Sequence, residues 1–291
     1  MRAVIFGFVL LLTTSAYGQE EGDVPVIQTF RHTRVINSHS VETLPARKLD
    51  FRVVHRFGDF AGDAGGWPTF YGLETAADVS IGFEYGVTDN MMVGINRASG
   101  SGPLKQNLNG LIKFKIMNQE EPGNLPVSLA VLAVGTYSTM QKSQIESALN
   151  FFERNSHRMS YHIGFHLARK FSDNFSFQIQ SAMTYRNVVP AGDTNELVSV
   201  GAGMRIQLSK ATGLILDANF PVLSDLRTSE NGYYPAIGIG FEFDTSGGHV
   251  FQINFTNSTG ISETDFIPYT RSNWGDGQYR LGFTISRLFS L

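Results

Sequence analysis

Along most of this chain, apolar side chains recur at every second position, and this period of two constrains the fold more than any other feature. In residues 78–86, for example, Val79, Ile81, Phe83 and Tyr85 alternate with small or polar residues. Because neighbouring side chains on a strand point to opposite faces, such alternation predicts strands with one apolar and one polar face. The pattern predicts twelve strands, near residues 48–57, 78–87, 90–98, 107–117, 127–137, 157–171, 174–187, 196–209, 212–221, 235–244, 248–257 and 277–291. The fifth is small and apolar on both faces, so its register is the hardest to assign.

Two architectures suit such strands. In a soluble β-sandwich the apolar faces turn inward to a core, whereas in a membrane β-barrel they turn outward to lipid. The connections favour the barrel, because outer-membrane barrels alternate short periplasmic turns with long external loops. Tight turns are expected at 88–89, 172–173, 209–211 and 245–247, and longer loops at 58–77, 99–106, 138–156, 222–234 and 258–276. One connection departs from this scheme: residues 118–126 fall among the short periplasmic turns but are longer than a tight turn.

Aromatic residues gather at both strand ends when the strands are laid antiparallel. Paired aromatic girdles are expected where a lipid-facing wall meets the two headgroup regions. The predicted periplasmic ring contains Tyr85, Phe171, Phe175, Phe243 and Phe289, and the predicted outer ring contains Phe57, Tyr137, Tyr185, Phe220 and Tyr279.

The last predicted strand runs to the end of the sequence and carries Tyr279, Phe283, Ile285 and Phe289 in one register, although Arg287 interrupts the face. A terminal strand of this kind is the segment by which barrels are handed to the barrel-assembly machinery. We therefore expect that machinery and outer-membrane lipid as partners. The expected fold is all-β: a single up-and-down antiparallel transmembrane β-barrel of about 12 strands, with both termini in the periplasm.

Several stretches resemble a known family. They are TSGGHVFQ (245–252), FTNS (255–258), GFTISRLF (282–289), TRVINSHSVE (33–42), HRFG (55–58) and ARKF (168–171). Together they resemble uncharacterised bacterial outer-membrane β-barrel proteins, a domain of unknown function typical of Bacteroidetes. The resemblance implies a barrel and an outer-membrane location, and it implies no activity.

The first eighteen residues are interpreted as a secretory signal peptide. Arg2 provides the positive start, residues 4–12 an apolar run, and Ala16-Tyr17-Gly18 a small-residue cleavage site. The apolar run is about half of the roughly 20 residues that a membrane-spanning helix needs. We therefore expect a signal peptide at 1–18, an N-terminal periplasmic or lumenal segment at 19–47, and a barrel at 48–291 in the bacterial outer membrane.

Composition excludes several classes of function. The chain has 23 basic and 26 acidic residues and a formal net charge of −3, which gives no electrostatic case for nucleic-acid binding. It contains no cysteine, so disulfides, thiolate metal sites, cysteine nucleophiles and a lipoprotein-type anchor are excluded. We expect no cofactor.

The polar strand faces are expected to line the lumen. The candidate lining residues are Arg52, Arg56, Glu84, Lys113, Lys115, Arg158, His162, Arg186, Arg205, Asp217, Glu242 and Arg280. One interpretation is a polar pore whose charges select solutes, and the other is an ion-pair network that stabilises the wall. Eight-stranded barrels are filled by side chains and sixteen-stranded ones hold an open channel, so about twelve strands predict a narrow, partly obstructed lumen.

Metal binding and catalysis have only weak signals. His162 and His166 share the lumen face of one strand, but four residues along a strand span roughly 13 Å, which is too far for both to bind one ion. Ser38, His39 and Ser40 precede the first strand, and the sequence has no Gly-x-Ser-x-Gly elbow. We expect no metal site and no enzyme.

Residues 19–47 are long for a mere leader and carry Arg31, His32, Arg34, His39 and Arg47. One hypothesis is a plug or strap that enters the lumen and meets its acidic residues. The alternative is a loosely ordered periplasmic segment.

In the long loop 138–156, Ser143 and Glu146 have the spacing of a capping box. Ile145, Leu149 and Phe152 follow at helical spacing. The loop is therefore predicted to form a short amphipathic helix, which either covers the outer mouth or packs on the rim.

The function expected from these features is a porin-like barrel, a narrow pore or transporter for small polar solutes. The alternative is a non-conducting structural or docking barrel that binds a partner through its loops or its N-terminal segment. No sequence feature identifies a solute.

Overall fold

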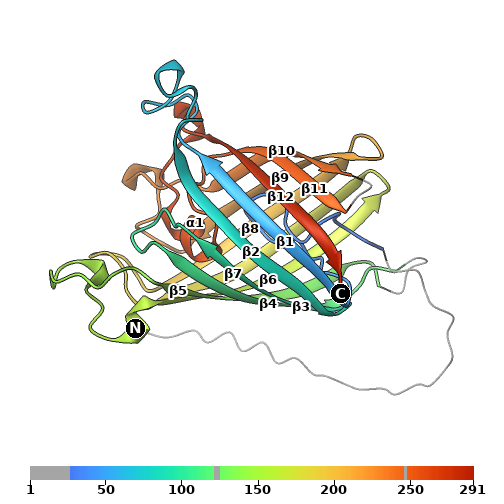
Figure 1. Cartoon of the computed structure of the whole chain (residues 1–291), viewed down its shortest axis with the longest axis horizontal. Helices are drawn as coiled ribbons and strands as arrows, with labels where there is room; N and C mark the ends of the chain where they lie inside the picture. The colour runs from blue at the N-terminus through green and yellow to red at the C-terminus, as the bar shows by residue number, and fades with distance from the viewer. Residues whose placement is uncertain (1–26, 121–124, 246–247) are drawn as a thin grey trace.

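The computed structural model describes residues 27–120, 125–245 and 248–291, which form a closed antiparallel barrel of twelve strands (Figure 1). Strands adjacent in sequence pair with each other, and β12 closes the barrel against β1. The strands are β1 (Lys48–Phe57), β2 (Ala76–Thr88), β3 (Met91–Ala98), β4 (Asn107–Met117), β5 (Ser128–Ser138), β6 (Met159–Ser172), β7 (Phe175–Arg186), β8 (Glu196–Gln207), β9 (Thr212–Val222), β10 (Ala236–Asp244), β11 (His249–Thr256) and β12 (Arg280–Ser290). The predicted barrel and its strands are confirmed. The predicted signal peptide lies outside the described residues.

In the described residues, one α-helix and five 3₁₀ turns lie in the connections. They are α1 (Glu263–Tyr269), η1 (Trp67–Thr69), η2 (Leu149–Phe151), η3 (Asn155–Arg158), η4 (Ser229–Asn231) and η5 (Trp274–Asp276). In the described part of the chain, no helix is long and apolar enough to span a membrane.

Burial in the barrel is inverted relative to a soluble protein. Ile81 on β2 is 49% exposed and Phe165 on β6 is 51% exposed, both on the outer surface. Lys113 on β4 and His166 on β6 are instead buried inside. An apolar outer band around a polar interior is the arrangement of a barrel whose solvent is lipid.

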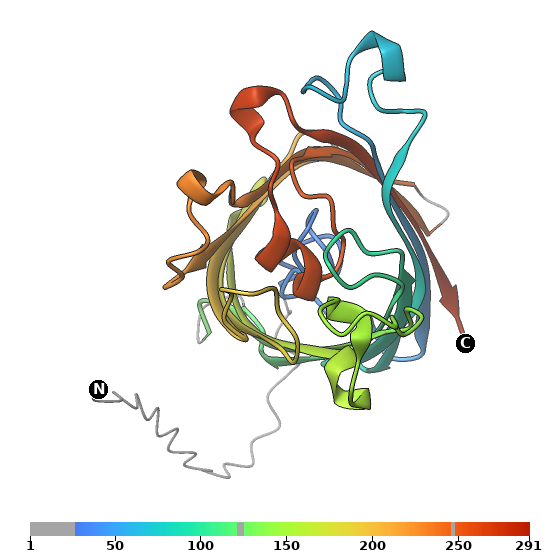
Figure 2. The same cartoon turned by 90° about the vertical axis from the view of Figure 1, so that its left-hand side faces the viewer.

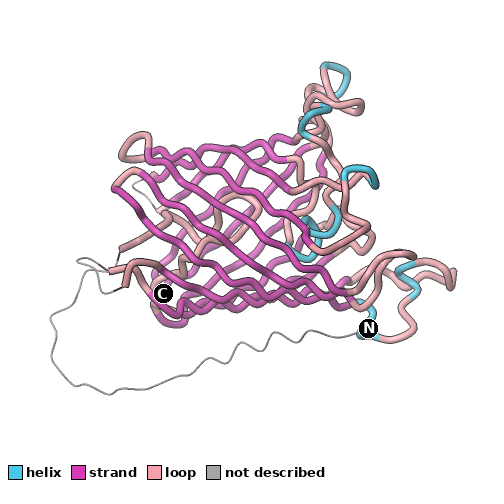
Figure 3. The backbone as a smooth tube through the Cα atoms, turned by 180° about the vertical axis from the view of Figure 1, so that it is seen from behind, coloured by secondary structure: helices cyan, strands magenta, loops and turns pink. Residues whose placement is uncertain are grey.

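The two ends of the barrel differ. One end carries the short connections, which are the β2–β3, β4–β5, β6–β7, β8–β9 and β10–β11 links. We call it the turn end. The opposite end carries the long connections, and we call it the loop end (Figure 3). The β4–β5 link is the longest at the turn end, as expected, and Glu120 N donates to Leu125 O across it at 3.1 Å.

The predicted helix in the 138–156 loop is wrong. Only the 3₁₀ turns η2 and η3 form in this region, and Ile145 is 66% exposed. The loop folds back on itself, because Ser143 N donates to Asn150 O at 2.9 Å. Phe152 then adopts a left-handed backbone with φ 45° and lies under the Arg158 guanidinium, 4.1 Å from ring centre to Cζ. These local contacts replace the helix that the spacing predicts.

Two segments lie inside the ring of strands (Figure 2). The N-terminal hairpin, residues 27–47, enters from the turn end. The lumenal loop, residues 257–279, enters from the loop end and carries α1, whose residues 263–268 are all buried. The lumen is therefore filled by the chain itself.

Placing a charge on the lipid-facing surface tests the orientation of the wall. We expect Phe165→Arg to lower the free energy of unfolding in lipid vesicles by about 2–4 kcal/mol, because Phe165 lies midway along β6 and arginine is most costly at the bilayer midplane. Denaturant titration measures the change. The control is Leu208→Arg in the β8–β9 turn, where the cost falls to about 0–1 kcal/mol. Equal losses at both positions would contradict the assignment.

Candidate functional site

The N-terminal hairpin begins and ends at the turn end of the barrel. Ile27 N donates to Gln119 O at 2.9 Å, and Arg47 N donates to Gly86 O at 2.8 Å. Between these points the two arms pair, since Ser40 N donates to Thr33 O at 2.9 Å. The hairpin turns at residues 35–38, which lie deep in the lumen.

The tip of the hairpin is held by Asp217 on β9. Its carboxylate accepts hydrogen bonds from the backbone N–H groups of Asn37 and Ser38 and from the Asn37 side chain, each at 2.7 Å. Arg56 on β1 donates to the Asn37 side-chain oxygen at 2.8 Å. Hydrogen bonds to a buried carboxylate are among the stronger ones in proteins, so this contact fixes the depth of the hairpin.

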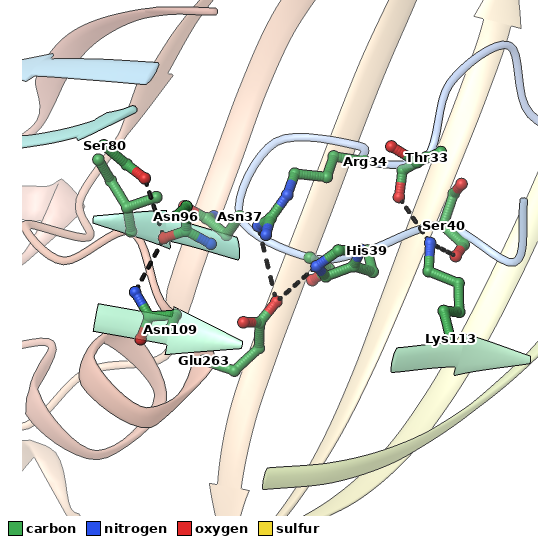
Figure 4. Close-up of polar contacts among 12 residues, drawn as sticks. Thr33, Arg34, Asn37, His39, Ser40, Ser80, Asn96, Asn109, Lys113 and Glu263 are labelled. Atoms are coloured by element: carbon green, nitrogen blue, oxygen red, sulfur yellow. Dashed lines mark hydrogen bonds and ion pairs between the residues drawn. The ribbon is translucent and has the colours of Figure 1, made fainter. Parts of the chain in front are cut away.

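The arms of the hairpin are held by lysines of β4. Lys113 Nζ donates to the carbonyl oxygens of Thr33 and Ser40 at 3.0 Å (Figure 4). It also donates to the carbonyl oxygen of Glu42 at 2.8 Å. An ammonium group has three donors, and all three are used here. Lys115 Nζ bonds the Glu42 carboxylate at 2.6 Å.

A charged cluster joins the hairpin to β1 and β2. Glu84 accepts a hydrogen bond from the Thr33 hydroxyl at 2.9 Å and lies 3.6 Å from the Arg34 guanidinium. Arg52 bonds Asp50 at 2.7 Å and lies 3.7 Å from Glu84. Each of these buried charges therefore has an opposite charge beside it.

Apolar packing completes the seat of the hairpin. One cluster contains Phe30, Val35, Ile36 and Val41 of the hairpin with Ala130, Ala168 and Ile215 of the wall. A second contains Leu44 with Met92, Leu111, Leu132 and Val134. These contacts explain why β5 is apolar on both faces: its outer face meets lipid and its inner face meets the hairpin.

The lumenal loop closes the other half of the interior. Phe266 and Ile267 of α1 pack with Leu197 and Ala236 of the wall. The Thr264 hydroxyl lies 2.7 Å from that of Thr136 on β5. Helix α1 is thus seated against both sides of the barrel.

A buried ion-pair cluster holds the end of α1. Arg186 of β7 donates to the Tyr269 hydroxyl at 3.0 Å and pairs with Asp193 at 2.9 Å. Arg227 pairs with Asp193 at 2.6 Å and donates to Pro268 O at 3.1 Å. Burial alone would raise the pKa of Asp193, but the hydrogen bonds and charges of Arg227 and Arg186 outweigh it and lower the pKa to about 2.

The two lumenal segments meet at Glu263, the first residue of α1. Its carboxylate lies 3.7 Å from the Arg34 guanidinium and 3.6 Å from the His39 ring (Figure 4). Burial raises the pKa of Glu263 and lowers the pKa of His39 well below its usual value. Arg34 is therefore the cation of this contact, and His39 is neutral at pH 7.

Little space remains in the middle of the lumen. A cavity of about 10 Å³ lies between the hairpin and α1, and another of about 20 Å³ lies beside Arg34 and Arg52. Cavities of about 580 Å³ and 230 Å³ flank the hairpin at the turn end. In this conformation the described residues obstruct the passage at its centre.

The candidate lining residues lie on the inner face of the barrel, with one exception. Arg52, Arg56, Glu84, Lys113, Lys115, His162, Arg186, Asp217 and Glu242 are buried there, and Arg205 pairs with Glu242 near the turn end. Arg280 is at the loop-end rim, where it bonds the Ser272 hydroxyl at 2.9 Å. The exception is Arg158, which belongs to η3 and donates to the carbonyls of Ser138 and Met140. It lies at the loop-end edge of β5, with its guanidinium over the Tyr137 and Phe152 rings.

The two histidines of β6 come closer than their backbone spacing suggests. Their Nε2 atoms lie 3.1 Å (His162) and 3.2 Å (His166) from the point where a Cβ on Gly164 would be, so both rings lean over the glycine. His39 and Glu263 line the same 10 Å³ cavity. Even so, the described residues contain no group of three or more histidine or acidic side chains placed to hold a metal ion.

Ser38 has a structural environment. Its hydroxyl accepts hydrogen bonds from the side-chain amides of Gln180 at 2.9 Å and Asn219 at 2.8 Å. Neither ring nitrogen of His39 has a hydrogen-bond partner among the described residues. The Ser38–His39–Ser40 run is therefore not arranged as a nucleophile with its base.

Sequence reasoning missed Glu263, Asp265 and α1 as parts of the lumen. The available signal was weak: Ser262 followed by acidic residues is an N-terminal helix pattern, but α1 is only 7 residues long and contains Pro268. It did identify residues 19–47 as a possible plug, from their basic residues.

Removing the charge of Asp217 is expected to loosen the hairpin. In Asp217→Asn an NH₂ group replaces one acceptor oxygen and faces donors, and each lost bond to a charged group costs about 1.5–3 kcal/mol. Amide hydrogen exchange in residues 33–42 should accelerate roughly tenfold or more, since 1.4 kcal/mol is tenfold. Asp244→Asn, at the partly exposed Arg31–Asp244 pair, is the matched control and should have little effect. Unchanged exchange in Asp217→Asn would contradict this anchor.

The seating of α1 should depend on pH through Asp265. Burial raises the pKa of this carboxyl to about 7, although the Ser101 N–H, 2.8 Å from it, opposes the shift. The folded form thus favours the protonated acid, and its contribution to stability is full below about pH 4 and is lost as the pH rises through about 7. The protection factors of the amides in residues 258–272, which correct for the intrinsic rise of exchange with pH, should fall over that range. Asp265→Asn should remove this dependence, and a dependence that survives in Asp265→Asn would assign it to another group.

The barrel is similar to several solved structures at low identity. The NanC porin is 9% identical over 84% of this chain and 100% of its own, with a TM-score of 0.49. The KdgM porin in complex with disordered oligogalacturonate is 5% identical over 84% and 99%, with a TM-score of 0.48. An outer membrane channel from Pseudomonas putida F1 is 14% identical over 86% and 98%, with a TM-score of 0.48. Likeness at this level says nothing about what this chain carries.

No curated protein matches the sequence. One family model does, over residues 30–289, which takes in most of the N-terminal hairpin, β1 to β11, the lumenal loop and β12 except its last residue. The chain therefore belongs to the family of the membrane bound beta barrel domain (DUF5777).

Proposed function

We propose that this chain is a narrow pore for small polar solutes in the bacterial outer membrane, closed at rest by its own N-terminal hairpin and lumenal loop. An antiparallel barrel with short turns at one end and long loops at the other is the form of outer-membrane barrels, whose turn end is periplasmic. Twelve strands enclose a lumen wider than that of the eight-stranded barrels that side chains alone can fill. The hairpin and α1 occupy this extra width.

The observation that carries the proposal is how the hairpin is attached. Both of its ends lie at the turn end, and it continues into the barrel only through Lys48 of β1. Withdrawing it toward the periplasm would break no strand pair of the barrel. Asp217, Lys113 and Lys115 hold it by hydrogen bonds to charged groups, each worth about 1.5–3 kcal/mol. In the open state, water would have to replace these bonds, and the apolar contacts of Phe30 and Val41 would be lost as well.

The lumenal loop is a second barrier in this proposal. Because α1 enters from the loop end, it would have to move outward for a solute to pass. The Arg34–Glu263 contact links the two barriers, so displacement of the hairpin would leave Glu263 without its cation. Opening at one end would then favour opening at the other.

Export through a signal peptide at 1–18 and assembly through the C-terminal strand are part of the same proposal. The Leu291 amide donates to Arg47 O at 3.1 Å, next to the start of β1. An assembly signal at this position would lie at the seam where the barrel closes. We propose transport as the activity, with no catalytic step.

The second candidate is a non-conducting barrel that docks a partner through its loops or hairpin. The small central cavities, about 10 and 20 Å³, favour it. The two candidates differ in whether current passes when the hairpin is free to move.

A disulfide that locks the hairpin distinguishes them. A Cβ on Gly203 of β8 would lie 3.4 Å from Cγ2 of Val35 at the hairpin tip, with no close clash. A cysteine Sγ at position 35 can take the place of Cγ2, so Val35→Cys with Gly203→Cys brings the two thiols close enough to be tested as a disulfide pair. The chain has no other cysteine to interfere.

In planar bilayers we expect the channel-opening frequency of the oxidised double variant to be at least tenfold lower than that of the wild type. A reducing agent should restore its openings. Each single cysteine variant is the control and should be insensitive to oxidation. A chain that passes no current in any of these states, and also none after deletion of residues 28–44, would favour the docking barrel. Equal conductance with and without the lock would exclude the hairpin as the gate.

A further inference from the structure

The β1–β2 loop at the loop end leaves the barrel sideways. In the end-on view it extends away from the ring of strands instead of folding over the lumen (Figure 2). Three aromatic side chains of this loop are exposed: Trp67 is 74% exposed, Phe70 50% and Tyr71 41%. We call residues 58–75 the aromatic loop. Its direction places these rings beside the barrel wall and not above the pore.

The aromatic loop joins the wall through a continuous series of ring contacts. Phe60 packs on Phe255 of β11 at 5.1 Å and on Tyr279 at 5.6 Å between ring centres. Tyr71 packs on Phe60 at 5.2 Å and on Trp67 at 6.5 Å. On the other side, Trp274 stacks on Tyr279 at 4.8 Å. Both tryptophans of the chain therefore belong to this one patch.

The backbone of the aromatic loop is held firmly. Phe60 N donates to Tyr279 O at 2.8 Å, and Ala61 N donates to Gly277 O at 3.2 Å. Phe70 and Tyr71 have φ of 46° and 56°, a left-handed conformation that bulky residues seldom adopt. Such geometry persists only where the surrounding structure imposes it. The rings are therefore exposed because the fixed conformation of the loop holds them at the surface.

We propose that the aromatic loop lies in the membrane–water boundary and inserts Trp67 and Phe70 among lipids. Tryptophan and tyrosine favour this boundary because their rings are apolar and their N–H or O–H groups are polar. The patch is continuous with the lipid-facing wall through Phe255, so lipid is the occupant that the barrel already brings to this surface. The proposal does not depend on whether the barrel conducts.

The charges of the loop suit a neutral lipid surface. The Asp59 carboxylate is used inside the loop, where it accepts from the N–H groups of Gly62 at 3.2 Å and Ala64 at 3.3 Å. Asp63 and Glu74 are exposed, and the loop contains no lysine or arginine. Attraction to anionic headgroups therefore has no basis here. Insertion of the rings, and not charge, would hold the loop.

Tryptophan fluorescence tests the proposal directly, because the chain has only two tryptophans. Trp274→Phe leaves Trp67 as the only reporter, and Trp67→Phe leaves Trp274. Each full-length variant is placed in phosphatidylcholine vesicles, either plain or carrying bromine near the headgroup end or deep in the acyl chains. Trp67 emission should be quenched at least twofold by shallow bromine, and less by deep bromine. Iodide on both sides of the membrane should quench it weakly.

Two results would overturn the proposal. Strong quenching of Trp67 by iodide, with none by brominated lipid, would place the loop in water. Protection from both quenchers would mean that protein covers the patch, and a change with the protein-to-lipid ratio would identify a second copy as the cover. Circular dichroism of each variant in the vesicles confirms that the barrel is folded. Trp274, which donates to Ile237 O at 3.2 Å, is the packed internal reference.

Discussion

A barrel that turns its apolar side chains to lipid has many charged side chains in its interior, and each of them needs a partner of opposite charge or a hydrogen bond. The rest of this structure depends on that constraint. A charge buried without a partner is very costly. The wall alone does not provide all the partners. Lys113 finds three carbonyl oxygens only in the hairpin, and Asp217 finds its N–H donors there as well. Wall and hairpin are therefore one electrostatic unit.

The same constraint explains how well the strands could be predicted. Because lipid faces one side and a polar lumen the other, alternation persists over nearly every strand, and its positions follow directly from the sequence. The one ambiguous strand, β5, is ambiguous for a physical reason. Leu132 and Val134 face the lumen but meet Leu44 of the hairpin, so both faces of β5 are apolar and the alternation disappears.

The interior was harder to predict, because its contacts join segments far apart in the sequence and follow no period. The period of two identifies Lys113 and Asp217 as inward-facing, but it does not say that hairpin atoms meet them. Arg34 and Glu263 are 229 positions apart and touch only once the barrel is closed. The 138–156 loop fails for another reason: local contacts that follow no period, such as that of Phe152 with Arg158, override its helical spacing.

The seam of the barrel has a consequence for how the molecule is put together. β1 pairs with β12 from Lys48–Ser290 to Arg56–Gly282, so the ring joins the first strand to the last. The hairpin immediately precedes β1 in the chain. Until β12 pairs with β1, the barrel is an open sheet, and the hairpin can pack on its inner face from the side. Once β1 and β12 have paired, the hairpin can enter the lumen only along the barrel axis, through the opening at the turn end. The order of these two events decides whether the cylinder forms around the hairpin or has to be filled afterwards.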